Sequence, residues 1–272
     1  MASISTADIK KLRESTGAGM TDCKNALVEA DGEYDKAVEL LRIKGLKGVA
    51  KREGRAASNG LVAAVLDGTT RGTMLELNCE TDFVAKGAPF QELAGKVVQA
   101  AKGHNDAAAI TVEGKPLKQV LDDAGALLGE KIEVRRVVTL EAPYVGVYLH
   151  KTNPDLPPQL GVLVELNGDN AELARDVAQH VAAFAPRFTT REEVADDVVA
   201  KEREIAEATA REEGKPEQAM AKIVEGRVAG FFKDNVLVEQ AFAKDNKKTV
   251  AKVLAEAGVA VTGFARFKVG QA

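Results

Sequence analysis

The sequence predicts an α+β protein with three helices at its N-terminus, a core of two related α+β halves with antiparallel strands, and an inserted helical hairpin. Three observations predict this arrangement. Residues 1–45 carry capping residues and apolar positions typical of short helices, and residues 61–77 and 145–166 each have a β-hairpin pattern that leads into a helix. Residues 190–232 carry helical apolar spacing interrupted at Gly214.

Composition limits the classes of function. The chain has 272 residues, 45% of them hydrophobic and 29% charged, with a net charge of −4. This charge disfavours a dedicated nucleic-acid binder, which must neutralise phosphates. The N-terminus lacks a secretory pattern, and no run approaches the ~20 apolar residues of a membrane helix. Cys23 and Cys79 form no C-x-x-C motif, so we expect a cytoplasmic, reduced protein with no membrane or direct nucleic-acid partner.

The N-terminal helices are predicted from their caps and stops. Thr6, Thr21 and Asp35 are the expected N-caps. The expected stops are Thr16-Gly17, Asp31-Gly32 and Gly45. A unit this small buries little apolar surface and is typical of a docking module. Residues 42–55 then hold six basic residues against Glu53 alone, which could contact RNA or an acidic partner; with no aromatics interleaved for base stacking, a solvated linker helix is favoured. The first domain is therefore residues 1–55.

The first core half is predicted over residues 56–144. Leu61–Leu66 and Met74–Leu77 flank a turn at Asp67-Gly68, which favours a β-hairpin. A helix is expected over residues 90–101, further helical structure over 106–131, and a strand over 132–140.

The second half is predicted over residues 145–189 and 233–272. Val145–Leu149 and Gly161–Leu166 predict a second hairpin, whose loop carries three prolines and which leads into a helix near Glu172. A short helix is expected over Val250–Leu254, and a last strand over Val259–Val269.

The inserted hairpin is predicted over residues 190–232. Thr190 and Glu193 fit a capping box, and Gly214 and Pro216 mark the break between the two helices. The expected apolar stripes are Val194, Val198, Ile205 and Ala208 on the first helix, and Ala219, Met220, Ile223 and Val224 on the second. Stripes this narrow suit an arm that projects or pairs, so the hairpin could mediate self-association.

An internal repeat relates the two halves. Glu76-Leu77-Asn78 matches Glu165-Leu166-Asn167 at an offset of 89, whereas Glu92-Leu93-Ala94 matches Glu172-Leu173-Ala174 at an offset of 80. The first half therefore holds nine extra residues within Cys79–Gln91. An extension on one of two equivalent units is a candidate for function. The alternative is that Phe83 and Val84 pack back onto the core.

Enzymatic motifs are lacking in the sequence. There is no phosphate-binding G-x-x-x-x-G-K-[ST] motif, and no serine lies in G-x-S-x-G. His104, His150 and His180 lack metal-ligand spacing. We therefore predict a protein that is not an enzyme and has no cofactor or metal site.

Two signatures then resemble the elongation factor Ts family. Leu12–Leu27, LRESTGAGMTDCKNAL, resembles its N-terminal signature, and Cys79–Lys86, CETDFVAK, resembles its second. Matching segments continue to the end of the chain, over Gly161–Val164, Lys201–Ile205, Gly214–Pro216, Val224–Arg227 and Val261–Phe267. The departures are Gly87, where the family usually has Asn or Asp, the long loop Thr152–Gln159, and the lack of a C-terminal helix that some members add.

The resemblance implies a ubiquitin-associated-like (UBA-like) N-terminal domain, a coiled coil at residues 190–232, and a guanine nucleotide exchange factor of translation elongation. Its implied partner is the GTPase elongation factor Tu, from which the family releases GDP. Thr81, Asp82, Phe83 and Val84 match the motif that dislodges magnesium from the partner's nucleotide site. Met20 matches the N-terminal docking surface, and His150 a histidine that faces the partner's GTPase domain. The alternatives are a chaperone-like scaffold without exchange activity and an RNA-associated factor that uses residues 42–55.

Overall fold

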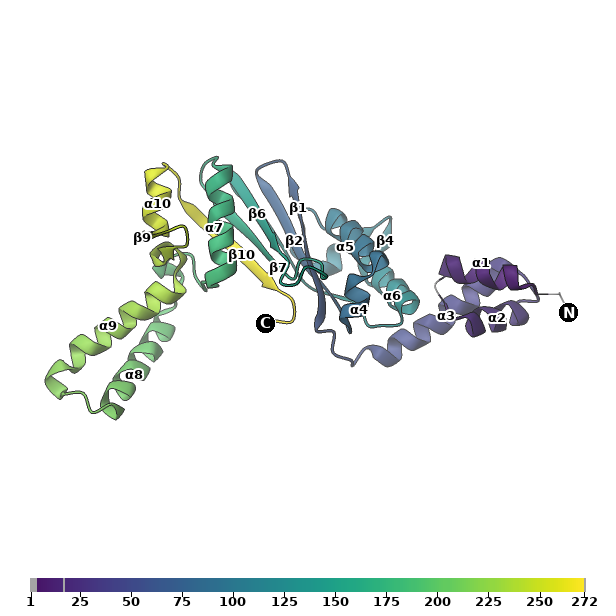
Figure 1. Cartoon of the computed structure of the whole chain (residues 1–272), viewed down its shortest axis with the longest axis horizontal. Helices are drawn as coiled ribbons and strands as arrows, with labels where there is room; N and C mark the ends of the chain where they lie inside the picture. Colours follow the sequence, from purple (N-terminus) through teal and green to yellow (C-terminus); the bar gives the residue numbers. More distant parts are fainter. Residues whose placement is uncertain (1–3, 17, 272) are drawn as a thin grey trace.

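The computed structural model describes residues 4–16 and 18–271, and the side chains of all of these except residues 14, 46, 47 and 49–51. The molecule is elongated, with helices α1–α3 at one end, the long helices α8 and α9 at the other, and two three-stranded sheets between them (Figure 1). Each sheet pairs its strands antiparallel in the described part of the chain. These features confirm the predicted α+β class.

The N-terminal module consists of α1 (Thr6–Thr16), α2 (Met20–Glu29) and the first half of α3 (Tyr34–Arg52). Its small core is made by apolar side chains from all three helices: Leu12, Cys23, Ala26, Leu27, Ala30 and Ala37.

The predicted caps and one predicted stop of this module are wrong. Ser5 caps α1 in place of Thr6, because its hydroxyl accepts a hydrogen bond from Asp8 N at 3.2 Å. The second helix begins before Thr21, and the third before Asp35, each without a side-chain cap. Helix α3 continues past Gly45 because the side of the helix that carries Gly45 packs on the core. This packing offsets the loss of helix stability that a glycine causes. Of the other stops, α1 ends at Thr16, and Gly17 lies outside the described residues.

The first sheet has the order β1-β2-β5. Its strands are β1 (Asn59–Asp67), β2 (Arg71–Cys79) and β5 (Glu133–Glu141). Helices α5 (Ala88–Ala100) and α6 (Leu117–Leu128) cover its outer face and share a core with it. Helical structure throughout residues 106–131 was a wrong prediction. A 3-10 turn (Ala107–Ala109) and a small hairpin, β3 (Thr111–Val112) with β4 (Lys115–Pro116), precede α6. The cause is a tight turn with positive φ at Glu113 and Gly114.

The second sheet has the order β10-β7-β6. Its strands are β6 (Tyr144–His150), β7 (Leu160–Leu166) and β10 (Val261–Lys268). Helices α7 (Ala171–Phe184) and α10 (Val250–Glu256) cover its outer face. The inner faces of the two sheets meet through a separate apolar cluster of Val62, Met74, Val145, Leu163 and Phe267. The core therefore has four layers, with helices outside two stacked sheets (Figure 1).

The two halves repeat the same order of elements. In each, the middle strand of the sheet leads to a helix, and a small hairpin followed by a helix precedes the last strand. In the second half this small hairpin is β8 (Ala241–Phe242) with β9 (Asp245–Thr249). Two segments break the correspondence: the short helix α4 (Asp82–Lys86) after β2, and the helical hairpin after α7. The extra residues that the sequence places after β2 thus form α4.

The helical hairpin consists of α8 (Asp196–Glu212) and α9 (Glu217–Asn235), with a tight connection at Gly214, where φ is 67°. Thr190 and Glu193 do not form the predicted capping box, because α8 begins only at Asp196. Residues Arg191–Glu193 form a 3-10 turn, and Glu193 accepts a hydrogen bond from Thr189 N at 2.7 Å. Ile205 and Ala208 are exposed, so their assignment to the inner stripe was wrong. Ala206 and Ala210 take those places opposite Met220 and Val224.

Candidate functional site

Helix α4 is held on the core by its second half. Ala85 is fully buried, and Val84 packs against the same apolar cluster beneath the first sheet. Thr81 caps the helix, because its hydroxyl accepts a hydrogen bond from Val84 N at 3.4 Å. Gly87 follows with φ −66° and ψ 136°. Any residue can adopt these backbone angles, so the backbone does not require glycine in place of the Asn or Asp that is usual in the family.

Phe83 points away from this core. Its side chain is 81% exposed, the largest exposure among the described large apolar side chains. The alternative in which Phe83 packs back onto the core is therefore wrong, although it holds for its neighbour Val84. Its exposed ring therefore contributes little buried apolar area to the core.

Charge surrounds Phe83. The Lys86 ammonium forms an ion pair with Asp82 at 2.8 Å and lies 6.0 Å from the centroid of the Phe83 ring. The hydrogen bond from Lys86 lowers the pKa of Asp82 below its ordinary value. The carboxylate next to the exposed ring is therefore ionised at neutral pH.

Glu130 fixes the start of α4 from a distant part of the chain. One of its carboxylate oxygens accepts hydrogen bonds from the backbone N–H groups of Glu80 (2.9 Å) and Thr81 (3.0 Å), and the other accepts from the Thr81 hydroxyl (2.5 Å). In return, the Glu80 carboxylate accepts a hydrogen bond from Lys131 N at 2.7 Å. That backbone hydrogen bond is the main reason that the pKa of Glu80 is lowered. Glu130 was not predicted from the sequence, because a contact across 49 residues leaves no local pattern.

Cys79 lies beneath the same turn. Its thiol is buried and donates a hydrogen bond to the Thr81 carbonyl at 3.2 Å. Burial, together with the nearby charge of Glu130, raises its pKa to about 12. The thiol therefore stays neutral and acts as a packing group.

His150 ends strand β6 and is exposed. Its Nδ1 lies 2.9 Å from the Tyr148 hydroxyl, and its carbonyl accepts a hydrogen bond from Gln159 N at 3.1 Å. The loop after it approaches α4. The pKa of Lys86 is raised, first by its hydrogen bond to Asp82 and also by the charge of Asp155 in that loop. The structure thus brings this loop and the Phe83 helix to the same edge of the two sheets.

Met20 lies elsewhere. It is the first residue of α2, 44% exposed, in the N-terminal module at one end of the molecule (Figure 1). The structure therefore presents the predicted site residues on two separate surfaces, one around α4 and one on α2.

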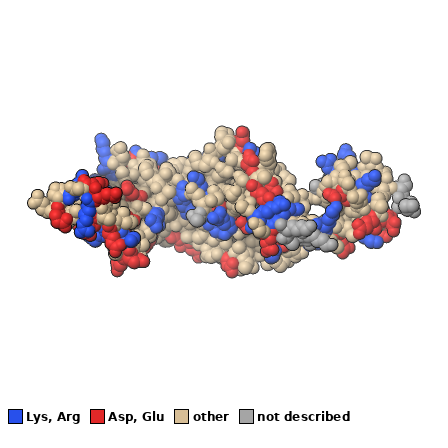
Figure 2. Space-filling view, turned by 90° about the horizontal axis from the view of Figure 1, so that it is seen from below, with Lys and Arg blue, Asp and Glu red and all other residues tan. Residues whose placement is uncertain are grey.

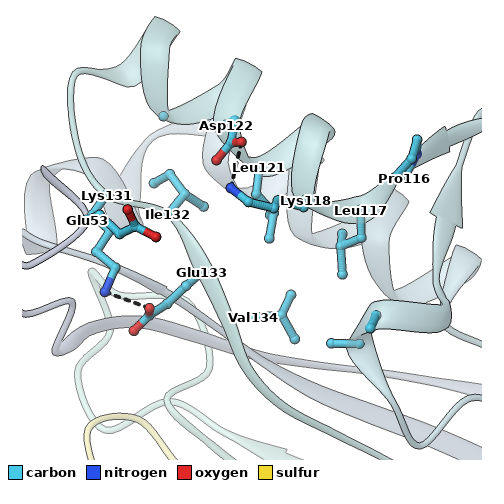
Figure 3. A pocket seen from close by; sticks show the side chains of 13 residues that line it. Glu53, Pro116, Leu117, Lys118, Leu121, Asp122, Lys131, Ile132, Glu133 and Val134 are labelled. Carbon is cyan, nitrogen blue, oxygen red and sulfur yellow. Dashed lines mark hydrogen bonds and ion pairs between the residues drawn. The ribbon is translucent and has the colours of Figure 1, made fainter. Parts of the chain in front are cut away.

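A groove of about 710 Å³ lies between α6 and the start of β5. Apolar side chains line it, and two ion pairs, Lys118 with Asp122 and Lys131 with Glu133, stand at its rim (Figure 3). None of the six predicted site residues lines this groove.

The basic connector is largely engaged within the protein. Arg42 pairs with Asp123, Arg55 with Glu80 and Lys44 with Asp22, while Arg52 donates to the Gly125 carbonyl. The side chains of Lys47 and Lys51 lie outside the described set. Figure 2 shows Lys and Arg lying among Asp and Glu on the face that it presents. Among the described helices, none has the length and apolar character needed to cross a membrane.

Comparison with known proteins assigns the family. The family model described as "Elongation factor TS" matches residues 80–271. The chain is 61% identical to the elongation factor Ts of Acidothermus cellulolyticus over 276 residues, covering 100% of both chains. It is 56% identical to that of Thermobifida fusca over 278 residues, again covering 100% of both. It is 57% identical to that of Streptomyces ramocissimus over 277 residues, covering 99% of this chain and 100% of that one. The chain therefore belongs to the elongation factor Ts family.

Proposed function

We propose that this chain is a guanine nucleotide exchange factor of translation elongation, which binds elongation factor Tu in its GDP form and promotes release of GDP so that GTP can bind. The observation that carries the proposal is Phe83, which is 81% exposed on a short helix that the equivalent second half does not have. Family membership supplies the partner. The chain makes or breaks no covalent bond in this function.

The physical basis of exchange is linkage. A protein that binds the nucleotide-free GTPase more tightly than the GDP form must weaken GDP binding by the same factor. Magnesium is the largest local positive charge at the partner's nucleotide phosphates. Inserting the Phe83 ring between elements that orient the ligands of the metal would loosen that hold, and burying a phenylalanine contributes about 1.5–3 kcal/mol to the inserted state.

The neighbours of Phe83 have separate roles in this proposal. Asp82, kept ionised by Lys86, would compete for hydrogen-bond donors near the magnesium site. Thr81 and Val84 hold α4 in place, through the bonds to Glu130 and the contact with the core. Helix α4 and the Phe83 ring are therefore already ordered before they contact the partner, which reduces the entropy lost on binding.

Two further contacts complete the proposed complex. Met20, exposed on a UBA-like N-terminal domain, docks on the partner, and His150 faces the partner's GTPase domain from the edge that also carries α4. The long helices α8 and α9 are proposed to form a coiled-coil arm, which could also mediate self-association. The RNA-associated alternative loses support because Arg42, Lys44, Arg52 and Arg55 have partners within the protein.

The test is the Phe83→Ala variant. An interface aromatic costs about 2 kcal/mol or more when truncated, which corresponds to a roughly thirtyfold slower release of GDP. Stopped-flow release of a fluorescent GDP from elongation factor Tu measures this rate. Because Phe83 is exposed, the melting temperature should stay that of the wild type. Removing magnesium with a chelator should bring the variant's release rate toward the wild-type rate.

The matched control is Ile205→Ala, which truncates another exposed apolar side chain, 48% exposed on α8. It should leave GDP release unchanged. If Phe83→Ala releases GDP at the wild-type rate, insertion of the Phe83 ring is not part of the mechanism. A wild-type chain that binds elongation factor Tu without changing GDP release would instead favour the scaffold.

A further inference from the structure

The N-terminal module is attached to the core along one face of α3, which runs from the module to the first sheet (Figure 1). Arg42, Gly45 and Arg52 lie on this face, because spacings of 3 and 7 residues return to the same side of an α-helix. They meet Asp123, Ala126 and Gly125 of α6. We call these six residues the α3–α6 seam.

Glycine at position 45 is explained by close approach at the seam. A Cβ atom at Gly45 would lie 2.6 Å from the Ala126 Cβ, closer than two carbon atoms can approach without movement. Glycine weakens the interior of a helix, yet α3 keeps one here, nearly midway along its 19 residues. The side chain at this position therefore sets how closely α3 and α6 can pack.

Polar contacts fix the direction of the packing. Arg42 Nε donates to Asp123 Oδ1 at 3.1 Å and Nη2 donates to Oδ2 at 3.3 Å, a two-point contact that restricts the relative orientation of the two helices. At the other end of the seam, Arg52 Nη1 donates to the Gly125 carbonyl at 3.0 Å. Because Arg42 and Asp123 are partly exposed, this ion pair contributes more to orientation than to stability.

We infer that the α3–α6 seam is an orientation latch, which holds the N-terminal module at one fixed position on the core and so sets the spacing between Met20 and Phe83. The effect on exchange rests on the proposed function. Two contact points on one rigid body bind with less loss of freedom than two points joined by a loose connection. Arg42, Gly45 and Asp123 are therefore positioning residues for the exchange reaction.

Two pairs of variants open and re-form the seam. Arg42→Glu breaks the ion pair, and Arg42→Glu with Asp123→Arg restores it in reverse. Gly45→Ala introduces the clash, and Gly45→Ala with Ala126→Gly removes it. Lys36→Glu is the matched control, because Lys36 is an exposed lysine of α3 away from the seam and its replacement changes the charge as Arg42→Glu does.

The first measurement uses the free chain. Spin labels at Glu29→Cys on α2 and Lys102→Cys after α5 report the distance between module and core, and the native Cys23 and Cys79 are buried and remain unlabelled. We expect one narrow distance distribution for the wild type, the control and both double variants, and a broad one for Arg42→Glu and Gly45→Ala. Narrow distributions in both single variants would overturn the latch.

The second measurement is exchange on elongation factor Tu. Each single variant should bind the nucleotide-free GTPase about tenfold more weakly, since effective concentration falls when a rigid link becomes loose. The release rate at saturation should stay within about twofold of the wild type, and the double variants should regain affinity. Broad distances with wild-type affinity would overturn the positioning role. If the wild type itself promotes no release, the proposed function fails, while the distances still decide the latch.

Discussion

Glu130 offers a sharp test of the idea that α4 must be held in place to act. Its carboxylate is the acceptor for three hydrogen bonds at the start of α4, two of them from backbone N–H groups. Replacing it with alanine leaves these donors without their acceptor. Replacing it with glutamine keeps one oxygen in place, which can still accept from both N–H groups.

The structure sets the expected size of the effect. A hydrogen bond to a charged group contributes a net ~1.5–3 kcal/mol, so three bonds give an upper limit of about 5–9 kcal/mol. Glu130 is only partly buried, and water can replace part of this loss. We therefore expect Glu130→Ala to lower the free energy of unfolding by about 2–3 kcal/mol and Glu130→Gln by about 1 kcal/mol. For a chain of this size the alanine variant should melt about 5–10 °C lower.

Exchange activity should fall when α4 is less often held in its native position. If the released helix occupies its competent position only about a tenth of the time, exchange at low concentration falls about tenfold. The assays are a thermal melt, hydrogen exchange at the Val84 amide, and stopped-flow GDP release from elongation factor Tu. Glu133→Ala is the control, since it removes a nearby surface carboxylate that pairs with Lys131 at 2.8 Å. Wild-type protection at Val84 together with wild-type release in Glu130→Ala would refute the reasoning.

Two further predictions concern buried groups. Neither Cys23 nor Cys79 should react rapidly with a thiol reagent at pH 8 in the native protein, because both are buried and burial raises the pKa of Cys79 to about 12. Both thiols should react in urea. A rapidly reacting thiol in the native protein would contradict the observed packing. His180 is fully buried, Ala243 N donates to its Nδ1 at 3.2 Å, and burial lowers its pKa below the ordinary value near 6.5. As pH falls below about 6.5 the unfolded chain takes up this proton before the folded one does, so stability falls with pH in that window. Melts at pH 7.5 and 5.5 should show a smaller drop in melting temperature for His180→Gln than for the wild type, and an equal drop in both proteins would contradict this assignment.

The sequence by itself determined the class of the fold and most of its elements. Both β-hairpins, the helices after them and the break at Gly214 were predictable, because alternation, helical spacing and turn residues act over a few neighbours. The comparison of Glu76–Asn78 with Glu165–Asn167 also located the extra segment that carries Phe83, since a repeat provides its own internal reference. The two signatures then identified the family, which the comparisons confirmed.

Only the tertiary structure decided which of these residues are presented and what holds them. Phe83 and Val84 are adjacent and both apolar, and only the packing of α4 turns the first outward and the second inward. The sequence predicts that the third helix ends at Gly45, but in the structure Gly45 packs closely against Ala126 and α3 continues past it. Glu130 reaches Thr81 across 49 residues, and Arg42 reaches Asp123 across 81. Such contacts depend on where whole elements meet, and no local pattern records them because the free energy that fixes them comes from the packing of distant segments.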